Sequence, residues 1–486
     1  MKYVMTFLML CAAFGAQAAE KSGRLEGTIV SRDAATNRLT VAHGDVSGVM
    51  PAMTMPYEVR GQRVASLPKD GAKISAILHE SNGAFWLTDV KERPMSGMAP
   101  GKHEQMEHEH MQHQHLQPEQ MQHEHAGMQM HMPADAASDL LMRQASGTSM
   151  NPAAAPMHMA ALHGVAFVNA ATNSGPRGGD KIFSTNWMMA MADRPLAGGR
   201  VMFRSMLSLE PATIGRKYPE LFQTGEGVID GQHPHDFFME LAAEYARPLT
   251  PSTVAYIYAA PVGDPALGPV AYPHRASAAE IPQAPLSHHV QDSTHIAGSV
   301  VTLGAQSGML GYAVSGFHGR EPDNSNRWDI DTGRIDSWSA RVTFDPTPNV
   351  TAQISTGHLT HPEASEPGNV QRTTASVAYS TAMSSTSLIY GHNDKDHSTS
   401  AWVAESELKF DANYVTGRAE VVDKDELIAG EVIRVKALTL GYSREVMPNA
   451  ALGANVTRYW IPAAVKPQYG NSPRAVYLFV RLRGGV

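Results

Sequence analysis

Residues 337–344 have the sequence Ser337-Trp338-Ser339-Ala340-Arg341-Val342-Thr343-Phe344. Large apolar residues occupy every second position from Trp338 to Phe344, apart from a small Ala340, and serine, arginine and threonine stand between them. Successive side chains of a β-strand point to opposite faces, so this alternation predicts a strand with one apolar and one polar face. We take this pattern as the signature of the larger part of the chain.

The same alternation recurs from about residue 161 to residue 483. Between residues 402 and 410, for example, Trp402, Leu408 and Phe410 fall on one face, and Glu405 and Glu407 on the other. The pattern marks about 16 strands, at roughly 20 residues per strand with its connection, a size typical of large transmembrane barrels. We therefore predict an all-β chain in which residues 160–486 form an antiparallel transmembrane β-barrel.

The predicted connections alternate in length. The short ones lie at 194–199, 247–250, 306–308, 346–349, 411–413 and 448–449. The long ones lie at 210–232, 261–294, 319–334, 358–369 and 462–472. Short turns on one side and long loops on the other are typical of outer-membrane barrels. The alternative is a water-soluble all-β domain, whose strands also alternate because only one face of the sheet is buried.

The start of the chain predicts export to the cell envelope. Lys2 precedes an apolar run, and Ala16-Gln17-Ala18 is a small-residue cleavage site, so residues 1–18 are expected to be a signal peptide. The only cysteine, Cys11, lies inside it, so any metal site of the mature chain must use His, Met or carboxylate ligands. The formal net charge of -8 argues against a nucleic-acid partner.

Residues 19–93 form a separate predicted domain. Short alternating stretches at 25–30, 38–43, 72–78 and 84–90, separated by turn residues, predict a compact β-barrel. Within it, Met53 and Met55 stand two residues apart, so both thioethers would share one strand face. Thioethers are soft, neutral ligands that select Cu(I) or Ag(I), and His43 would complete the set. The alternative is that these methionines only fill a barrel core.

This segment resembles the CusF-like family of periplasmic copper- and silver-binding domains. The resemblance rests on Pro51-x-Met53-Thr54-Met55 together with the preceding His43. It implies a five-stranded OB-type barrel in which His43, Met53 and Met55 bind Cu(I) or Ag(I). Some members of the family have a tryptophan where Met50 stands here, and Met50 is therefore a candidate for an additional thioether ligand.

Residues 94–159 are predicted to be a disordered linker, because the strand pattern gives way to Gln, Glu, His, Met, Ala and Pro. Residues 98–132 hold eight histidines and seven methionines. Such tracts offer many weak metal sites, although a solubilising linker would have a similar composition. The layout is similar to that of CopB-type copper-resistance proteins. The candidate auxiliary ligands are His103, His108, His110, Met111, His113, His115, His123, His125, Met128, Met130 and His131.

Two histidine clusters precede predicted barrel strands, at 232–236 and 287–295. They contain His233, His235, His288, His289 and His295. If the loop at 261–294 folds into the barrel lumen, both clusters could line a constriction and bind or gate a metal ion. Hydrogen bonding of loops to the barrel wall is the alternative. A lumen hydrolase is a third interpretation, but the sequence has no nucleophile-elbow motif.

These features predict a non-enzymatic metal-resistance protein of the cell envelope. Its amino-terminal domain would capture Cu(I) or Ag(I) in the periplasm, next to an outer-membrane barrel that sequesters or exports the metal. The expected partners are the metal ion, outer-membrane lipid and a periplasmic copper chaperone or efflux component. The competing hypothesis is a passive porin-like or structural protein whose metal-binding segments only buffer ions.

Overall fold

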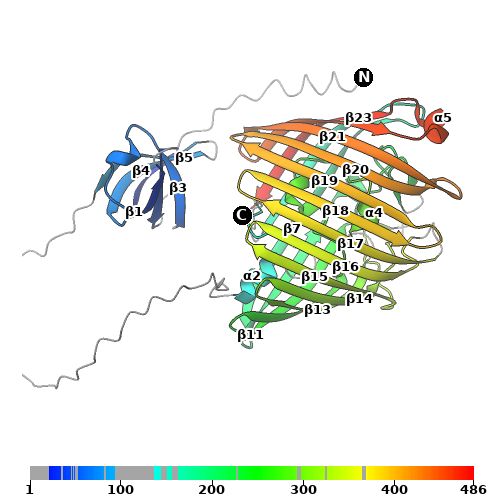
Figure 1. The fold of residues 1–486 in the computed structure, drawn as a ribbon, viewed down its shortest axis with the longest axis horizontal. Helices are drawn as coiled ribbons and strands as arrows, with labels where there is room; N and C mark the ends of the chain where they lie inside the picture. The colour runs from blue at the N-terminus through cyan, green and yellow to red at the C-terminus, as the bar shows by residue number, and fades with distance from the viewer. Residues whose placement is uncertain are drawn as a thin grey trace, which may run out of the picture. The chain divides into compact units, whose positions relative to one another are not determined.

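The computed structural model describes residues 21–33, 37–44, 46, 49, 53–81, 84–92, 136–143, 150–155, 162–225, 228–292, 297–322, 326–363 and 368–485. They belong to two compact units, with the division at residue 130 (Figure 1). The predicted signal peptide, Met50, His295 and all the candidate ligands between His103 and His131 lie outside the described residues.

The amino-terminal unit is a closed barrel with the strand order β1-β2-β3-β5-β4, which confirms the predicted five-stranded fold. β3 and β5 pair in parallel, and the other pairs are antiparallel. Buried residues such as Leu25, Val41 and Tyr57 form its own hydrophobic core. Its elements are β1 (Lys21–Asp33), β2 (Arg38–His43), β3 (Met53–Val59), η2 (Val64–Ser66), β4 (Lys73–Ser81) and β5 (Ala84–Glu92).

The second unit is a closed antiparallel barrel of 16 strands, sealed where β23 pairs with β6, and this confirms the predicted architecture (Figure 1). Its strands are β6 (Leu162–Asn173), β7 (Asp180–Leu196), β8 (Gly199–Leu207), β11 (Phe238–Thr250), β12 (Thr253–Val262), β13 (Gly298–Ser307), β14 (Leu310–His318), β15 (Ser337–Thr347), β16 (Val350–Thr360), β17 (Asn369–Ser380), β18 (Ser384–Asp394), β19 (Thr399–Phe410), β20 (Asn413–Ile428), β21 (Glu431–Met447), β22 (Ala450–Trp460) and β23 (Arg474–Gly485).

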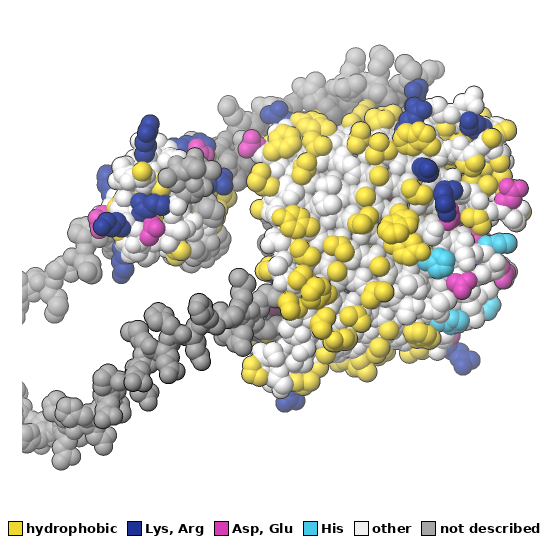
Figure 2. All heavy atoms as spheres, viewed as in Figure 1, with side chains coloured by type: hydrophobic (Ala, Val, Ile, Leu, Met, Phe, Trp, Pro, Cys, Tyr) yellow, Lys and Arg dark blue, Asp and Glu magenta, His cyan; other side chains and the backbone are white. Residues whose placement is uncertain are grey.

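The barrel wall is apolar outside and polar inside. Trp338 and Leu408 are 49% and 50% exposed, whereas Glu405 and Arg418 are each 1% exposed. Figure 2 shows hydrophobic side chains spread over the visible outer wall, while most of the charged side chains on this face gather near its ends. A water-soluble sheet would bury the large apolar face. The observed arrangement instead suits a wall surrounded by lipid and points to the outer membrane.

Short and long connections alternate as predicted. Residues 197–198, 308–309 and 448–449 form tight turns between neighbouring strands. The turn expected at 247–250 lies instead at 251–252, because β11 continues through Pro248. The long-loop side also has short members: residues 395–398 join β18 to β19, and Gly430 at φ 76° lies in the turn from β20 to β21. The loops carry α3 (Glu210–Thr213), β9 (Thr224–Gly225), β10 (Val228–Ile229), η3 (Tyr272–His274), η4 (Ala276–Ala278), α4 (His288–Gln291), η5 (Ala463–Val465) and α5 (Lys466–Tyr469).

The β12–β13 loop folds into the barrel lumen. Arg275 pairs with Glu405 of β19 at 2.5 Å, and Glu280 pairs with Arg481 of β23 at 2.9 Å. Arg418 of β20 donates a hydrogen bond to the carbonyl oxygen of Gln283 at 3.0 Å. The lumen-facing charges of the wall therefore hold this loop in place, and the loop fills much of the interior.

A helix was not predicted within the linker. α2 (Ala136–Arg143) buries Ala137, Leu140 and Leu141 in a cluster with lumen-facing residues of β7, β8, β11 and β12. The prediction of disorder is therefore wrong for residues 136–143, because their apolar side chains at helical spacing pack into the barrel. None of the described helices has the length and hydropathy needed to span a membrane.

Candidate metal centre

The small barrel brings His43 and Met53 together by strand pairing. In the antiparallel β2–β3 register, His43 is opposite Met53 and Val41 is opposite Met55. Directly opposed residues share a sheet face, and residues two apart on β3 share that face as well. The positions of His43, Met53 and Met55 therefore lie on one face, continuous with the buried ring of Tyr57.

The His43 imidazole is oriented by two contacts. Its Nδ1 lies 2.7 Å from the carbonyl oxygen of Gly44, which can only accept, so Nδ1 must donate and Nε2 carries the lone pair. That Nε2 atom contacts the hydroxyl of Tyr57. Burial raises the pKa of Tyr57 to about 12, so the hydroxyl keeps its proton and donates a hydrogen bond to Nε2. A metal ion binding at Nε2 would have to displace this hydroxyl.

The absence of a side chain at Gly27 of β1 leaves space for His43. Gly27 is the cross-strand partner of His43 on the other side of β2. A Cβ atom at position 27 would lie 2.5 Å from the carbonyl oxygen of Ala42 and 2.9 Å from the Cβ of His43. Any larger residue at position 27 would therefore push β1 away from His43.

The donor types at this face fit a soft monovalent ion. His43 is 6% exposed, and its Nδ1 contact leaves Nε2 as the coordinating nitrogen. The Met55 side chain is partly buried against the core, whereas the side chain of Met53 lies outside the described part. Imidazole with thioether is a neutral, soft ligand set of the kind that Cu(I) and Ag(I) prefer.

Comparison with known proteins agrees with this geometry. Residues 22–92 match the family model described as copper binding periplasmic protein CusF. The match covers nearly the whole small barrel, including both strands of the candidate metal face. We call this unit the CusF-like domain. No curated protein shows significant similarity to the chain.

Solved structures are similar to each of the two units. Apo-CusF residues 6–88 from Escherichia coli is 22% identical, over 16% of this chain and 96% of that chain, with a TM-score of 0.15. The anion-selective porin from Comamonas acidovorans is 12% identical, over 66% and 98%, with a TM-score of 0.47. The Salmonella typhi OmpF complex with daunomycin is 10% identical, over 66% and 97%, with a TM-score of 0.45.

In the barrel, the two predicted histidine clusters meet. The rings of His233 and His289 are 5.8 Å apart, and those of His288 and His289 are 4.0 Å apart. His235 is connected to this group through Tyr272. The ring of His235 is 6.0 Å from the ring of Tyr272, and the Tyr272 ring is 5.6 Å from the ring of His288. The loops that carry the clusters are therefore packed together at the barrel's long-loop side.

Burial and neighbouring charges shift the pKa values of these histidines in different directions. Burial lowers the pKa of His233 to about 3 and holds the pKa of His289 well below its usual range, so both imidazoles are neutral. Burial also acts to lower the pKa of His235, but the Glu210 carboxylate 2.8 Å from its Nδ1 outweighs it and raises that pKa. The Glu210 carboxylate thus favours the protonated form of His235.

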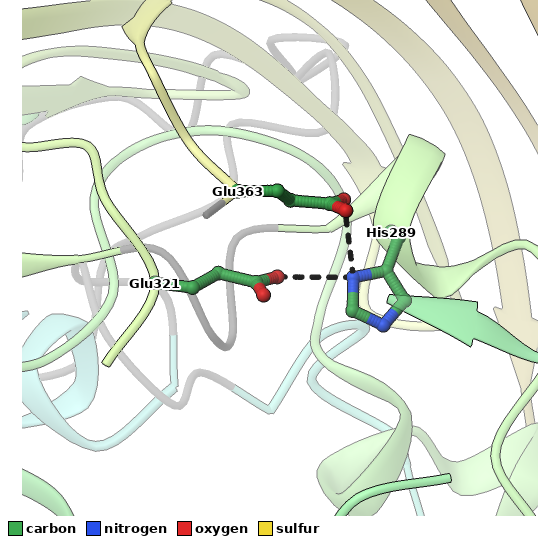
Figure 3. A group of neighbouring side chains, drawn as sticks. All are labelled: His289, Glu321 and Glu363. Carbon is green, nitrogen blue, oxygen red and sulfur yellow. Dashed lines mark hydrogen bonds and ion pairs between the residues drawn. The ribbon is translucent and has the colours of Figure 1, made fainter. Parts of the chain in front are cut away.

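His289 also belongs to a mixed cluster with two carboxylates, drawn in Figure 3. Its Nδ1 lies 3.0 Å from Oε1 of Glu321 and 3.8 Å from Oε1 of Glu363. The three side chains come from three different loops and are 9%, 2% and 13% exposed, respectively. One imidazole and two carboxylates suit a divalent ion such as Zn²⁺, in contrast to the soft set of the CusF-like domain.

Sequence reasoning missed the acidic partners of these histidines. Glu210, Glu321 and Glu363 stand in long loops, where isolated carboxylates are usually solvated. Only the packing of the loops brings them to His235 and His289. The sequence held only a weak indication of the contact between Glu210 and His235. Glu210 precedes Pro211 in the same long connection as the first histidine cluster.

Proposed function

We propose that this protein binds Cu(I) or Ag(I) in the periplasm through its CusF-like domain, and that the domain acts with the barrel in metal sequestration or efflux. The observation that carries the proposal is the pairing of His43 with Met53 inside the segment that matches the CusF family model. In this proposal, Met55 and Met50 supply further thioethers, and the histidines and methionines of residues 103–131 supply weaker sites nearby.

The barrel anchors this metal-binding segment in the outer membrane. Its apolar outer wall supports a membrane position, and its lumen is occupied by the β12–β13 loop and by α2. This filled lumen weighs against a permanently open, passive pore. A regulated path for the metal, or a purely sequestering anchor, fits the filled lumen better, with periplasmic copper chaperones or efflux components as the expected partners.

A lumen hydrolase has little support in the second histidine cluster. The hydroxyl of Ser287 lies 2.8 Å from Oε1 of Gln291, and Nε2 of His288 lies 3.0 Å from Oε1 of Gln232. Both groups are thus engaged by side-chain amides, whereas a nucleophilic serine needs a histidine as its base. We therefore propose a binding and transport role without catalysis.

The test is copper accumulation in cells that lack the gene and carry one of three plasmids. These encode the full chain, the chain with Met53→Ile and Met55→Ile, or the chain without residues 136–486. The proposal expects low cytoplasmic copper and growth in excess copper only with the full chain. Equal cytoplasmic copper and equal growth with all three plasmids would contradict a role in sequestration or efflux.

A further inference from the structure

Three lumen-facing residues form a row across neighbouring barrel strands. His163 of β6 is the cross-strand partner of Met189 of β7, and Met189 is the partner of Met206 of β8. The three residues are 5%, 1% and 1% exposed. Direct cross-strand partners have Cβ atoms about 4.5–5.5 Å apart on the same face. One imidazole and two thioethers therefore stand side by side inside the barrel.

A second imidazole reaches this row from the lumen loop. Nε2 of His274, in η3, lies 3.3 Å from Sδ of Met206. His274 is 1% exposed, and its Nδ1 has no hydrogen-bond partner among the described residues. Its ring stacks on Trp187 at 4.3 Å and meets the ring of His163 edge-on at 6.5 Å. The three strand residues and His274 of the lumen loop thus lie close together inside the barrel.

The simpler interpretation is that these methionines only fill a core. They belong to a buried cluster that also contains Met191, Met202 and the apolar face of α2, and methionine commonly fills irregular gaps. That interpretation leaves the buried imidazole of His274 unexplained. Burying an imidazole is costly unless its nitrogens are satisfied, and among the described residues the hydrogen-bond contact of His274 is to the weakly accepting thioether of Met206.

We propose that His163, Met189, Met206 and His274 form a second soft-metal site, for Cu(I) or Ag(I), inside the barrel. The site uses the same chemistry as the face of the CusF-like domain, where a histidine also stands opposite a methionine across antiparallel strands. It is neutral, rich in sulfur and buried, which excludes Mg²⁺ and Ca²⁺ because both prefer oxygen ligands.

The proposed barrel site borders a cavity. A cavity of about 290 Å³ is lined by His163, Trp187, Tyr272 and Pro273, and it extends to Glu210 and His235. An ion entering this cavity would meet His163 first, with Met189 and Met206 behind it in the strand row. The proposal deepens the proposed function by placing a metal site within the barrel, but its geometry rests on barrel residues alone.

The test counts tightly bound Cu(I) in the full chain, purified in detergent under anaerobic conditions and titrated against a Cu(I) chelator. Met189→Leu with Met206→Leu keeps similar side-chain volumes and removes both thioethers. The expected result is the loss of one tightly bound equivalent relative to the wild-type chain. The matched control is Met309→Leu with Met383→Leu, which alters two exposed methionines of the barrel turns and should lose none.

The failure of this proposal can be distinguished from the failure of the proposed function. Met53→Ile with Met55→Ile should remove a different equivalent, and combining the four substitutions should remove both. An unchanged Cu(I) count in the folded Met189→Leu, Met206→Leu variant would overturn the barrel site. Should that variant not fold, anomalous diffraction from wild-type crystals grown with Ag⁺ decides: a peak bonded to Met206 and His274 is expected, and its absence overturns the proposal.

Discussion

His43 at the end of β2 stands directly opposite Met53 of β3, and the Nε2 atom of this histidine is held by the hydroxyl of Tyr57. The histidine is thus positioned by one hydrogen bond through Nδ1 and blocked by another at Nε2. Binding of a metal at Nε2 exchanges the Tyr57 contact for a coordination bond. The contact with Tyr57 therefore lowers the metal affinity of the domain while stabilising its metal-free form.

Replacing Tyr57 with phenylalanine should increase Cu(I) affinity. The substitution removes the hydroxyl that competes for Nε2, a hydrogen bond worth about 0.5–1.5 kcal/mol, or roughly a twofold to tenfold gain in affinity. The measurement is chelator competition on residues 19–93. Thr88→Val is the matched control, because it removes a hydroxyl 2.8 Å from Nε2 of His79, which is not a candidate ligand, and should leave affinity unchanged. A weaker affinity in Tyr57→Phe would refute the competition.

Replacing Glu405 with glutamine should loosen the lumen loop. Glu405 pairs with Arg275 of the loop at 2.5 Å and with Arg418 of the wall at 3.0 Å, and removing one partner of a buried ion pair costs about 3–5 kcal/mol. We expect higher single-channel conductance in planar bilayers than for the wild-type chain. The exposed Glu431→Gln should behave as wild type. Equal conductance of the Glu405 variant and the wild type would show that the loop does not close the lumen.

The pair of His235 and Glu210 should make the β8–β11 loop sensitive to pH. Since the folded-state pKa of His235 is raised, its stabilising contribution is fully present below the unfolded pKa of about 6.5 and is lost as pH rises through the folded value. Amide protection factors near residue 235 should therefore be higher at low pH than at high pH. In Glu210→Gln this pH dependence should shrink; an unchanged dependence would mean that the pair is not its source.

The alternation of residue types was enough to predict the large barrel and a compact β-barrel in residues 19–93, whereas the five-stranded OB-type fold followed from the resemblance to the CusF-like family. The alternation from Trp338 to Phe344 predicted the strand β15, and the structure explains why: lipid outside and a polar lumen favour a period of two along the strands. The pattern of Glu405 and Glu407 opposite Trp402 likewise predicted which side chains share a face. Local alternation did not reveal which face was lumenal, because a soluble sheet has the same period.

The parts that were not predicted depend on contacts between distant segments. Helix α2 was missed because Leu140 and Leu141 stand in a stretch of linker composition, and only the lumen gives them apolar partners. Glu321 was missed because a loop carboxylate has no local signature of its partner, His289. His163 and His274 are separated by a long stretch of chain, and only barrel closure together with the inward fold of the loop brings them to Met206.

We propose that His43, Met53 and Met55 bind a soft metal ion. This claim is tested most directly by Cu(I) chelator competition on residues 19–93, with and without Met53→Ile and Met55→Ile. We expect the wild-type domain to hold one Cu(I) against the chelator, and the double variant, with its fold shown intact by circular dichroism, to lose it. Equal Cu(I) binding by the two proteins would contradict the claim.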